Sequence, residues 1–206
     1  MHPEILTNNQ QELLKFISIF KKNYYLVGGT AIALYIGHRR STDFDLFTFK
    51  TINKSFINKL IQKQKYKKQI IFIDNDQMHF LLNDIKITFF NYPYPVLHNV
   101  MFKNIISLPS LLTLSAMKAF ALGRRAKWKD YVDLYFIIKE YYSINDISME
   151  AKKIFGELYS EKLFRGQLAF HDDIDYSEPV EYLYDFNISE QDIKSFLIQK
   201  SLEDIN

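Results

Sequence analysis

A short apolar run that ends in two glycines is the feature that most constrains this fold. Residues 24–27 read as a buried strand, and residues 30–36 read as a helix with Thr30 as its cap. Gly28 and Gly29 lie between the two. This order leaves backbone N–H groups free at the helix N-terminus, where a phosphate can approach closely and the helix dipole favours its charge. Alone, such a pair more often marks a tight turn than a ligand site.

Two aspartates follow the glycines after a further short stretch of chain. Asp43 and Asp45 open a predicted strand over residues 43–49, and side chains two residues apart on a strand share one face. Like charges side by side repel each other, and strands disfavour aspartate. A cation would relieve the repulsion, and Mg²⁺ is commonly held by one or two carboxylates together with substrate phosphates. A solvated strand start is the alternative interpretation of an isolated pair.

The remaining pattern divides the chain into two parts. We expect a mixed α/β domain over residues 1–100 and an all-helical domain over residues 101–206, which makes the fold class α+β. The boundary is placed where strand patterns give way to helical ones, between residues 94 and 108. The expected helices are residues 9–22, 53–65, 109–122 and 128–142, and the further strands are residues 69–74, 78–83 and 85–92.

The composition excludes several classes of protein. Aromatic residues make up 16% of the 206 residues, which favours a packed core over a disordered chain. A net charge of +2 is too small for a general polyanion binder, so a nucleic-acid partner would need a local basic patch. The absence of cysteine excludes disulfides and thiolate metal sites. No stretch approaches the roughly 20 apolar residues of a membrane helix, so we expect a cytoplasmic protein without a membrane partner.

A second group of charged residues lies in the predicted helical part. Lys118 lies within an apolar helical stripe, so its ammonium either extends to water or meets a charged partner. Asp133 lies one turn before apolar residues of the next helix and also needs a partner. The two could form a salt bridge that only fixes the helix pair. Between them lies a dense basic turn, which contains Arg124, Arg125, Lys127 and Lys129.

Both groups resemble one known family. Gly-Gly-Thr followed by Asp-Phe-Asp resembles the nucleotidyltransferase signature of the DNA polymerase β superfamily. The wider segments, residues 27–34 and 37–47, are more narrowly similar to the AbiEii/AbiGii toxin family of nucleotidyltransferases. Residues 114–134, with a lysine helix, a basic turn and a Lys-Asp-x-x-Asp-Leu helix, resemble the same family. Arg39, Arg40 and Ser41 match its approach to the acidic pair, and the two arginines also suit contact with phosphate.

The resemblance implies a nucleotidyltransferase-like mixed sheet with flanking helices and a Mg²⁺-dependent transfer of a nucleoside monophosphate from an NTP to an acceptor. RNA, such as the 3′ end of a tRNA, is the expected acceptor, and a cognate antitoxin is the expected protein partner. Asp43 and Asp45 would bind the metal, Lys118 would contact phosphate, and Asp133 would orient Lys118 or act as base. The nucleotide phosphates would lie on Gly28, Gly29, Thr30, Arg39, Arg40 and Ser41. The acceptor backbone would lie on Arg124, Arg125, Lys127 and Lys129.

One position departs from the superfamily pattern. Active members carry a third carboxylate on a later strand, and this chain places Thr88 there. Asp84 lies about two pleats, roughly 13 Å, away along that strand. Loss of a charge-stabilising group commonly slows catalysis by about 10²–10³-fold. The alternative function is therefore a catalytically weakened nucleotide- or RNA-binding protein on the same fold. A purely structural interaction protein would require both motif matches to be accidental.

Overall fold

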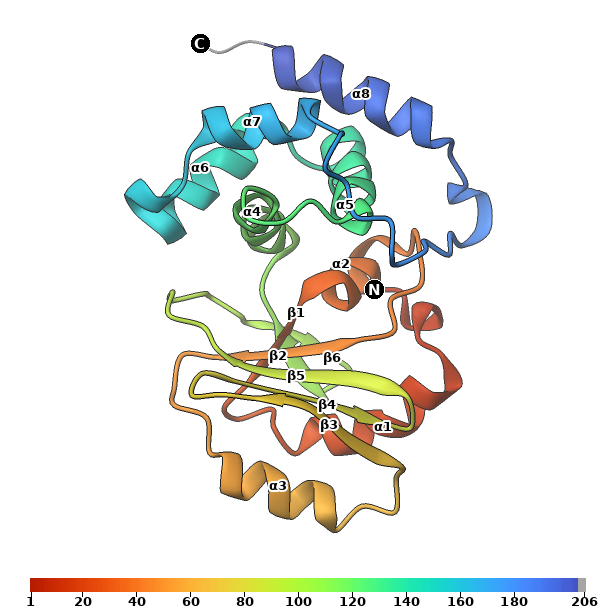
Figure 1. The fold of residues 1–206 in the computed structure, drawn as a ribbon, viewed down its shortest axis with the longest axis vertical. Coiled ribbons are helices and arrows are strands. Elements are labelled where there is room, and N and C mark those ends of the chain that lie inside the picture. The colour runs from red at the N-terminus through yellow and green to blue at the C-terminus, as the bar shows by residue number, and fades with distance from the viewer. Residues whose placement is uncertain (204–206) are drawn as a thin grey trace.

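The computed structural model describes residues 1–203 and contains one seven-stranded mixed sheet in its α/β half (Figure 1). The helices of the C-terminal half gather on one side of the molecule, above the strands in this view. The strands are β1 (Tyr25–Val27), β2 (Phe44–Thr48), β3 (Lys68–Ile73), β4 (Gln77–Leu82), β5 (Ile85–Asn91), β6 (Val100–Phe102) and β7 (Ile106–Leu108). The helices are α1 (Asn8–Ser18), α2 (Gly28–Ile36), α3 (Lys54–Gln62), α4 (Leu111–Leu122), α5 (Trp128–Glu140), α6 (Ile144–Phe155), α7 (Glu161–Ala169) and α8 (Glu190–Leu202).

The sheet has the order β3-β4-β5-β2-β1-β7-β6. Strand β2 is its centre: it pairs antiparallel with β1 and parallel with β5. β5 pairs in turn with β4, which pairs with the edge strand β3. Each strand that the apolar patterns predict over residues 24–92 is present, and the expected α+β class is confirmed.

The two faces of the sheet have different character because side chains alternate along each strand. Helix α1 covers one face, where Phe20, just beyond its end, meets Phe89 of β5 edge-to-face with ring centroids 4.7 Å apart. Phe80 of β4 stacks on the same Phe89 ring. The neighbouring residues along these strands, among them Thr88 and His79, therefore face the opposite side. That opposite face carries the site.

Helix starts follow the local sequence, with one correction. Thr7 closes a capping box on α1, and Ser110, Ser143 and Ser189 cap α4, α6 and α8. The expected cap at Thr30 is wrong, because α2 begins two residues earlier at Gly28. Thr30 therefore lies inside the first turn of α2, and its side chain is buried.

The expected boundary at residue 100 falls inside the sheet. Strands β6 and β7 follow it, and β7 pairs parallel with β1, so the sheet runs to Leu108. The helical half begins with α4 at Leu111. The buried apolar residues of both halves form one continuous cluster. The two-domain division itself stays a prediction.

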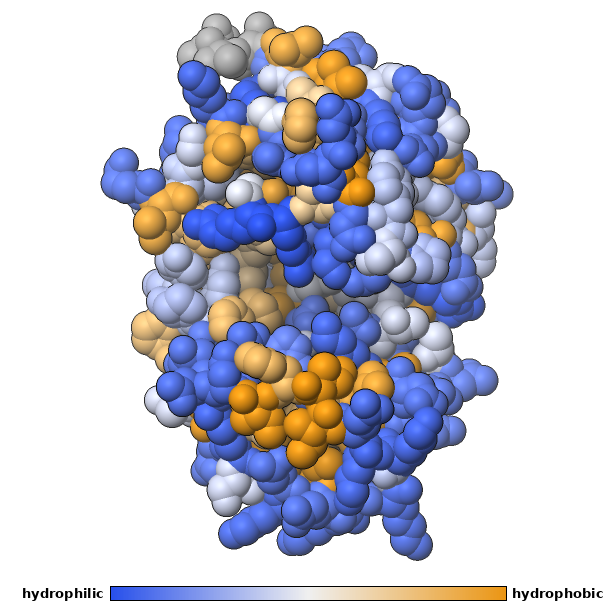
Figure 2. All heavy atoms as spheres, viewed as in Figure 1, coloured by the Kyte–Doolittle hydropathy of each residue, from blue (hydrophilic) through white to orange (hydrophobic). Residues whose placement is uncertain are grey.

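The edge strand β3 is exposed along its whole length. Ile70, Ile71, Phe72 and Ile73 are all exposed, and Figure 2 shows an apolar patch over this part of the sheet. Among residues 1–203, no helix is long and apolar enough to cross a membrane.

Candidate active site

Two adjoining cavities lie between the sheet and the helical half. The smaller, about 100 Å³, is lined by Gly28, Gly29, Asp43, Asp45 and several cations, and we call it the glycine cavity. The larger, about 420 Å³, is lined mainly by apolar side chains, including Phe47, Phe90, Tyr92 and Met117, and we call it the aromatic cavity. Gly28, Asp45, Lys86, Lys118 and Arg125 line both.

The glycine pair permits two close approaches at the start of α2. Gly28 has a φ of +73°, and a Cβ atom there would overlap the Asp45 carboxylate. A Cβ atom at Gly29 would come within 2.6 Å of Arg39 Nη2. Both positions therefore need glycine, Gly28 also because its left-handed backbone disfavours a side chain. The pair brings the N-terminus of α2 against a carboxylate and a guanidinium.

Asp43 and Asp45 both line the glycine cavity, from the start of β2. Burial, followed by the charge of Asp43, raises the pKa of the Asp45 carboxyl, and a hydrogen bond with Thr88 opposes this shift. A buried carboxylate that resists ionisation, next to a second carboxylate, is a donor set that a divalent cation would stabilise. The two residues thus fit one Mg²⁺ ion. Within residues 1–203 they are not part of a cluster of three or more His, Cys, Asp or Glu side chains.

Thr88 lies directly beside Asp45 on the parallel neighbour β5. Partners in register on adjacent strands point to the same face, so Thr88 faces the site beside Asp45. Asp84 lies outside the strands, in the turn between β4 and β5, where it pairs with Lys67 at the surface. It therefore lies outside both cavities.

Thr30 and Ser41 both lie beside the glycines, but only Ser41 lines the glycine cavity. The Thr30 hydroxyl is buried and donates to the Asp43 carbonyl in the loop before β2, and it also lies within hydrogen-bond distance of Ser41 Oγ, at 3.0 Å. It fixes the loop that carries the aspartates, and it does not line the glycine cavity. Ser41 does line that cavity. The expectation that the Thr30 hydroxyl contacts phosphate is corrected for this reason.

Asp133 is the centre of a fully buried charge network. Arg39 donates to both of its carboxylate oxygens, at 2.7 and 2.9 Å, and Lys118 Nζ lies 2.8 Å from Oδ2. His38 Nε2 lies 2.7 Å from Oδ1. Burial would raise the pKa of Asp133, but the charges of Arg39 and Lys118 hold it well below its ordinary value.

This network bears on the two roles expected for Asp133. The carboxylate has no exposed surface and both of its oxygens are engaged by Arg39, Lys118 and His38, which is an unfavourable arrangement for a base. It does contact Lys118, which also bonds Asp130 Oδ1 at 2.6 Å and lines both cavities. Arg39 lines the glycine cavity as well, yet Asp133 already holds its guanidinium on two sides.

The remaining cations separate into three groups. Arg40 pairs with Glu181 at 2.7 Å and lines neither cavity, which corrects its expected contact with phosphate. Arg124 lies 3.6 Å over the Phe120 ring and, with Arg125, lines the aromatic cavity. Lys127 and Lys129 line the glycine cavity instead.

A segment that sequence reasoning missed closes the glycine cavity. Residues 175–183, which we call the strap, are held at one end by Asp175, whose backbone bonds Ala126 at 2.7 Å and Trp128 at 3.0 Å. At the other end, Arg40 N donates to Glu181 O at 2.9 Å. Between these ends, Glu178 pairs with Lys127 and Lys129. Burial would raise the pKa of Glu178, but hydrogen bonds from the two lysines hold it at about 2.

Three more residues at the site were missed from the sequence. Lys86 of β5 lines both cavities, and Gln77 and His79 of β4 line the aromatic cavity. For Lys86, the sequence does contain a signal: residues two apart on a strand share one face, so Lys86 and Thr88 point to the same side of β5. For β4, only the pairing with β5 reveals that His79 stands opposite Thr88.

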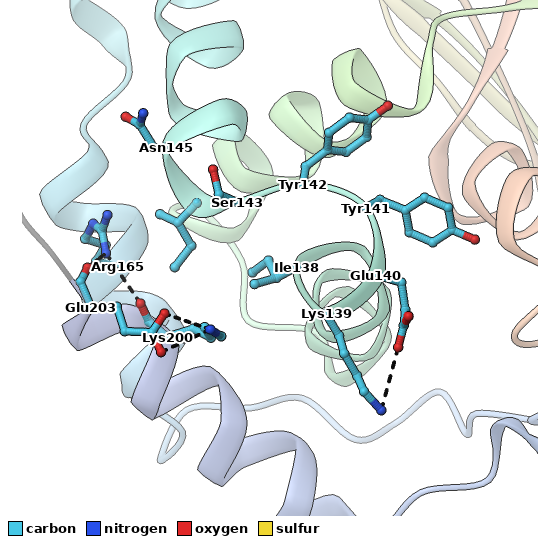
Figure 3. Close-up of a pocket in the computed structure, with 11 residues that line it drawn as sticks. Ile138, Lys139, Glu140, Tyr141, Tyr142, Ser143, Asn145, Arg165, Lys200 and Glu203 are labelled. Atoms are coloured by element: carbon cyan, nitrogen blue, oxygen red, sulfur yellow. Dashed lines mark hydrogen bonds and ion pairs between the residues drawn. The ribbon is translucent and has the colours of Figure 1, made fainter.

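A further cavity of about 450 Å³ lies in the helical half, near the ends of α5 and α8 (Figure 3). Its charged groups are engaged with one another: Lys200 contacts Glu203 at 2.7 Å, and Arg165 Nη1 donates to the Glu203 carbonyl at 2.8 Å. None of the residues expected from the sequence lines it. The candidate site therefore consists of the glycine and aromatic cavities.

Comparisons with known proteins agree with this geometry. Residues 13–202 match the family model described as nucleotidyl transferase AbiEii toxin, type IV toxin–antitoxin system. An uncharacterized protein of Aquifex aeolicus (strain VF5) is 31% identical over 174 residues, which cover 81% of this chain and 84% of that protein.

Two solved structures have a similar fold. MenT4, a nucleotidyltransferase toxin from Mycobacterium tuberculosis H37Rv, matches with a TM-score of 0.63 and 14% identity, over 94% of this chain and 80% of its own. JHP933 from Helicobacter pylori matches with a TM-score of 0.60 and 16% identity, over 94% of this chain and 89% of its own.

Proposed function

Because the chain belongs to the AbiEii family of nucleotidyl transferase toxins, we propose that it transfers a nucleoside monophosphate from an NTP to an acceptor in a Mg²⁺-dependent reaction. RNA, such as a tRNA 3′ end, is the proposed acceptor. An antitoxin encoded for this toxin is the proposed protein partner, as the type IV toxin–antitoxin description of the family suggests.

One observation carries the proposal: the Asp45 carboxylate lies against the glycine start of α2, with Asp43 beside it. A helix N-terminus attracts phosphate, and a carboxylate pair attracts Mg²⁺, so the two meet where a metal-bound triphosphate would lie. Lys118 borders the same space with its ammonium held by Asp130 and Asp133. In the proposed site, Gly28, Gly29 and Ser41 bind phosphate oxygens, and Lys118 neutralises their charge.

Asp43 and Asp45 would hold the ion, which when bound neutralises charge that develops on the phosphates during transfer. The chain's own groups do the rest of the positioning. The backbone N–H groups at the start of α2 orient the phosphates. Arg39 and Thr30 act indirectly, because each fixes the loop or helix that carries a phosphate or metal ligand.

Thr88 favours a second candidate function, a nucleotide- or RNA-binding protein with weakened catalysis. The threonine beside Asp45 leaves the donor set at two carboxylates. Two carboxylates together with phosphate oxygens suffice for one Mg²⁺ ion, so nucleotide binding would persist even where transfer is slow.

A single assay separates the two functions. The protein is incubated with each α-labelled NTP, Mg²⁺ and total RNA, beside Asp45→Ala and Lys118→Ala variants, with Mg²⁺-dependent nucleotide binding measured in parallel. We expect label in RNA with the wild type and none with either variant. Nucleotide binding without incorporation would favour the second function. Absence of any Mg²⁺-dependent binding would contradict the site itself.

A further inference from the structure

One row of side chains crosses three strands on the site face of the sheet. Asp45 of β2 is in register with Thr88 of β5, and Thr88 is in register with His79 of β4. Adjacent strands are about 4.8 Å apart, so His79 stands two strand spacings from the proposed metal ligand. Thr88 lies between them.

The row of Asp45, Thr88 and His79 leads away from the glycine cavity, where the phosphates of the NTP are proposed to lie. Asp45 borders both cavities, whereas Thr88 and His79 line only the aromatic cavity and Gly29 lines only the glycine cavity. In phosphoryl transfer the attacking and leaving oxygens are roughly in line across the reacting phosphorus. If the leaving phosphates lie on the glycines, the attacking group approaches from the side of Thr88 and His79.

His79 has a defined proton arrangement. Its Nε2 lies 2.8 Å from Gln77 Oε1, and the tautomer that this contact favours has the ring proton on Nε2, because a carbonyl oxygen can only accept. The neutral ring then has its free lone pair at Nδ1. Phe72 of β3 meets the ring edge-to-face with centroids 5.8 Å apart and adds no charge.

The charges around His79 favour this neutral ring. Burial and the positive charge of Lys86 on β5 lower the pKa of His79 below its ordinary 6.5, while the more distant Asp74 in the turn after β3 opposes them. Arg124 and Arg125 line the same cavity from the helical half. The lowered pKa favours the neutral imidazole, which is the form able to accept a proton.

From the register and the two cavities together, we propose that the aromatic cavity receives the hydroxyl-bearing end of a nucleoside acceptor and that His79 is the general base for that hydroxyl. The proposal rests on the proposed transferase function. The walls of the aromatic cavity suit this ligand, because the aromatic rings of Phe90 and Tyr92 offer stacking surface for a nucleobase. His79 thus supplies the proton acceptor that Thr88 does not provide.

The step balances as follows. The acceptor O–H proton passes to Nδ1 of His79 while the acceptor oxygen forms a bond to the α-phosphorus of the NTP. The bond from that phosphorus to the bridging oxygen breaks, and pyrophosphate leaves with the electron pair. The imidazolium then returns its proton to solvent, and the ring is again neutral.

The test uses the full chain, a labelled NTP, Mg²⁺ and bulk tRNA as the acceptor probe, under single-turnover conditions. We expect His79→Gln to lower the transfer rate by about 10²–10⁴-fold and to leave the affinity for the NTP unchanged. The wild-type rate should fall as the pH drops through the lowered pKa of His79, and this dependence should be absent in the variant. His98→Gln is the matched control, because that ring stacks on Tyr25 outside both cavities.

A second variant separates a catalytic from a structural role. Thr88→Asp places a carboxylate beside Asp45, so it should restore most of the lost rate in the His79→Gln background and change the rate little when His79 is present. A His79→Gln variant with wild-type rate and wild-type pH profile would overturn the inference, although the transferase function would stand. A wild-type protein that transfers nothing with any NTP would overturn the proposed function first.

Discussion

At the scale of single residues, Asp133 is the group on which the buried charges depend. Arg39, Lys118 and His38 all bond its carboxylate, and none of the four side chains is more than 7% exposed. Removing one partner of a buried ion pair leaves uncompensated charge and commonly costs about 3–5 kcal/mol. We therefore expect Asp133→Asn to lower the free energy of unfolding by about that amount, measured by urea denaturation.

The pH dependence follows from the same residue. Because the pKa of Asp133 is lower in the folded protein than in the unfolded chain, its contribution is fully present above the unfolded value of about 3.9 and is lost as the pH falls through the folded value. Asp84→Asn is the matched control, since Asp84 pairs with Lys67 at the surface, where such pairs contribute about 0–1 kcal/mol. Equal losses for both variants would contradict a central role for Asp133.

The contribution of Asp45 to stability has the opposite pH dependence to that of Asp133. Burial and the charge of Asp43 raise its pKa, so its ionised form opposes folding at neutral pH, and this cost disappears as the pH falls below the folded value. Asp45→Asn should therefore raise the free energy of unfolding by about 0.5–2 kcal/mol while it abolishes Mg²⁺-dependent nucleotide binding. Thermal unfolding and calorimetric titration measure the two effects. A variant that is destabilised and still binds the nucleotide would contradict the assignment on both counts.

At the scale of elements, the strap controls access to the glycine cavity. Glu178 supplies a carboxylate to Lys127 and Lys129 where the leaving phosphates of an NTP would lie in the proposed site. The remaining space of about 100 Å³ holds a few water molecules, less than a triphosphate needs. We therefore expect phosphates to compete with Glu178 for the two lysines, so removal of its charge should strengthen binding.

Glu178→Gln tests this competition directly. We expect about a three- to tenfold higher affinity for inorganic tripolyphosphate in the presence of Mg²⁺, because the lysine pairs are partly exposed and each is worth about 0.2–1 kcal/mol. Calorimetric titration gives the dissociation constant. Glu181→Gln is the control, since Glu181 lies on the same strap but pairs with Arg40 outside both cavities. A weaker affinity in Glu178→Gln would show that Glu178 helps the site instead of occupying it.

The elements also show what the sequence can predict. Strands and helices up to Tyr92 follow local patterns, and each expected one exists. Strands β6 and β7 were missed because they have three residues each and pair mainly with each other, and β7 joins the sheet through β1, about 80 residues away in sequence. The strap was missed for a related reason: its backbone bonds join loops near residues 40 and 127, which no local pattern encodes.

The site was predictable where spacing fixes geometry. The glycine pair, Asp43, Asp45 and Lys118 all line the glycine cavity, as the resemblance to the nucleotidyltransferase family implied. Thr30 and Arg40 were misplaced because a hydroxyl or guanidinium beside a motif bonds the nearest partner, and those partners are the loop before β2 and the strap. His79 was invisible for the same reason as β7, since its neighbour Thr88 lies on another strand.

At the scale of the whole molecule, the two halves depend on each other. Helix α2 belongs to the α/β half, yet α4 and α5 of the helical half pack on it. Asp133 of α5 neutralises the buried Arg39 and bonds His38, which lie in the loop after α2. The site itself takes Asp45 from one half and Lys118 from the other.

Separation of the halves should therefore unfold both. We expect a fragment of residues 1–109 to lack cooperative unfolding, because Arg39 and His38 would lose the carboxylate that compensates their burial and α2 would expose its apolar face. Urea titration followed by circular dichroism measures the transition, with the full chain as the reference and residues 110–206 as the companion fragment. A cooperative transition in residues 1–109 at the midpoint of the full chain would show instead that the sheet and α2 form an independent domain. In that case the buried network around Asp133 would join two folded units, and its loss would alter how they dock without unfolding either.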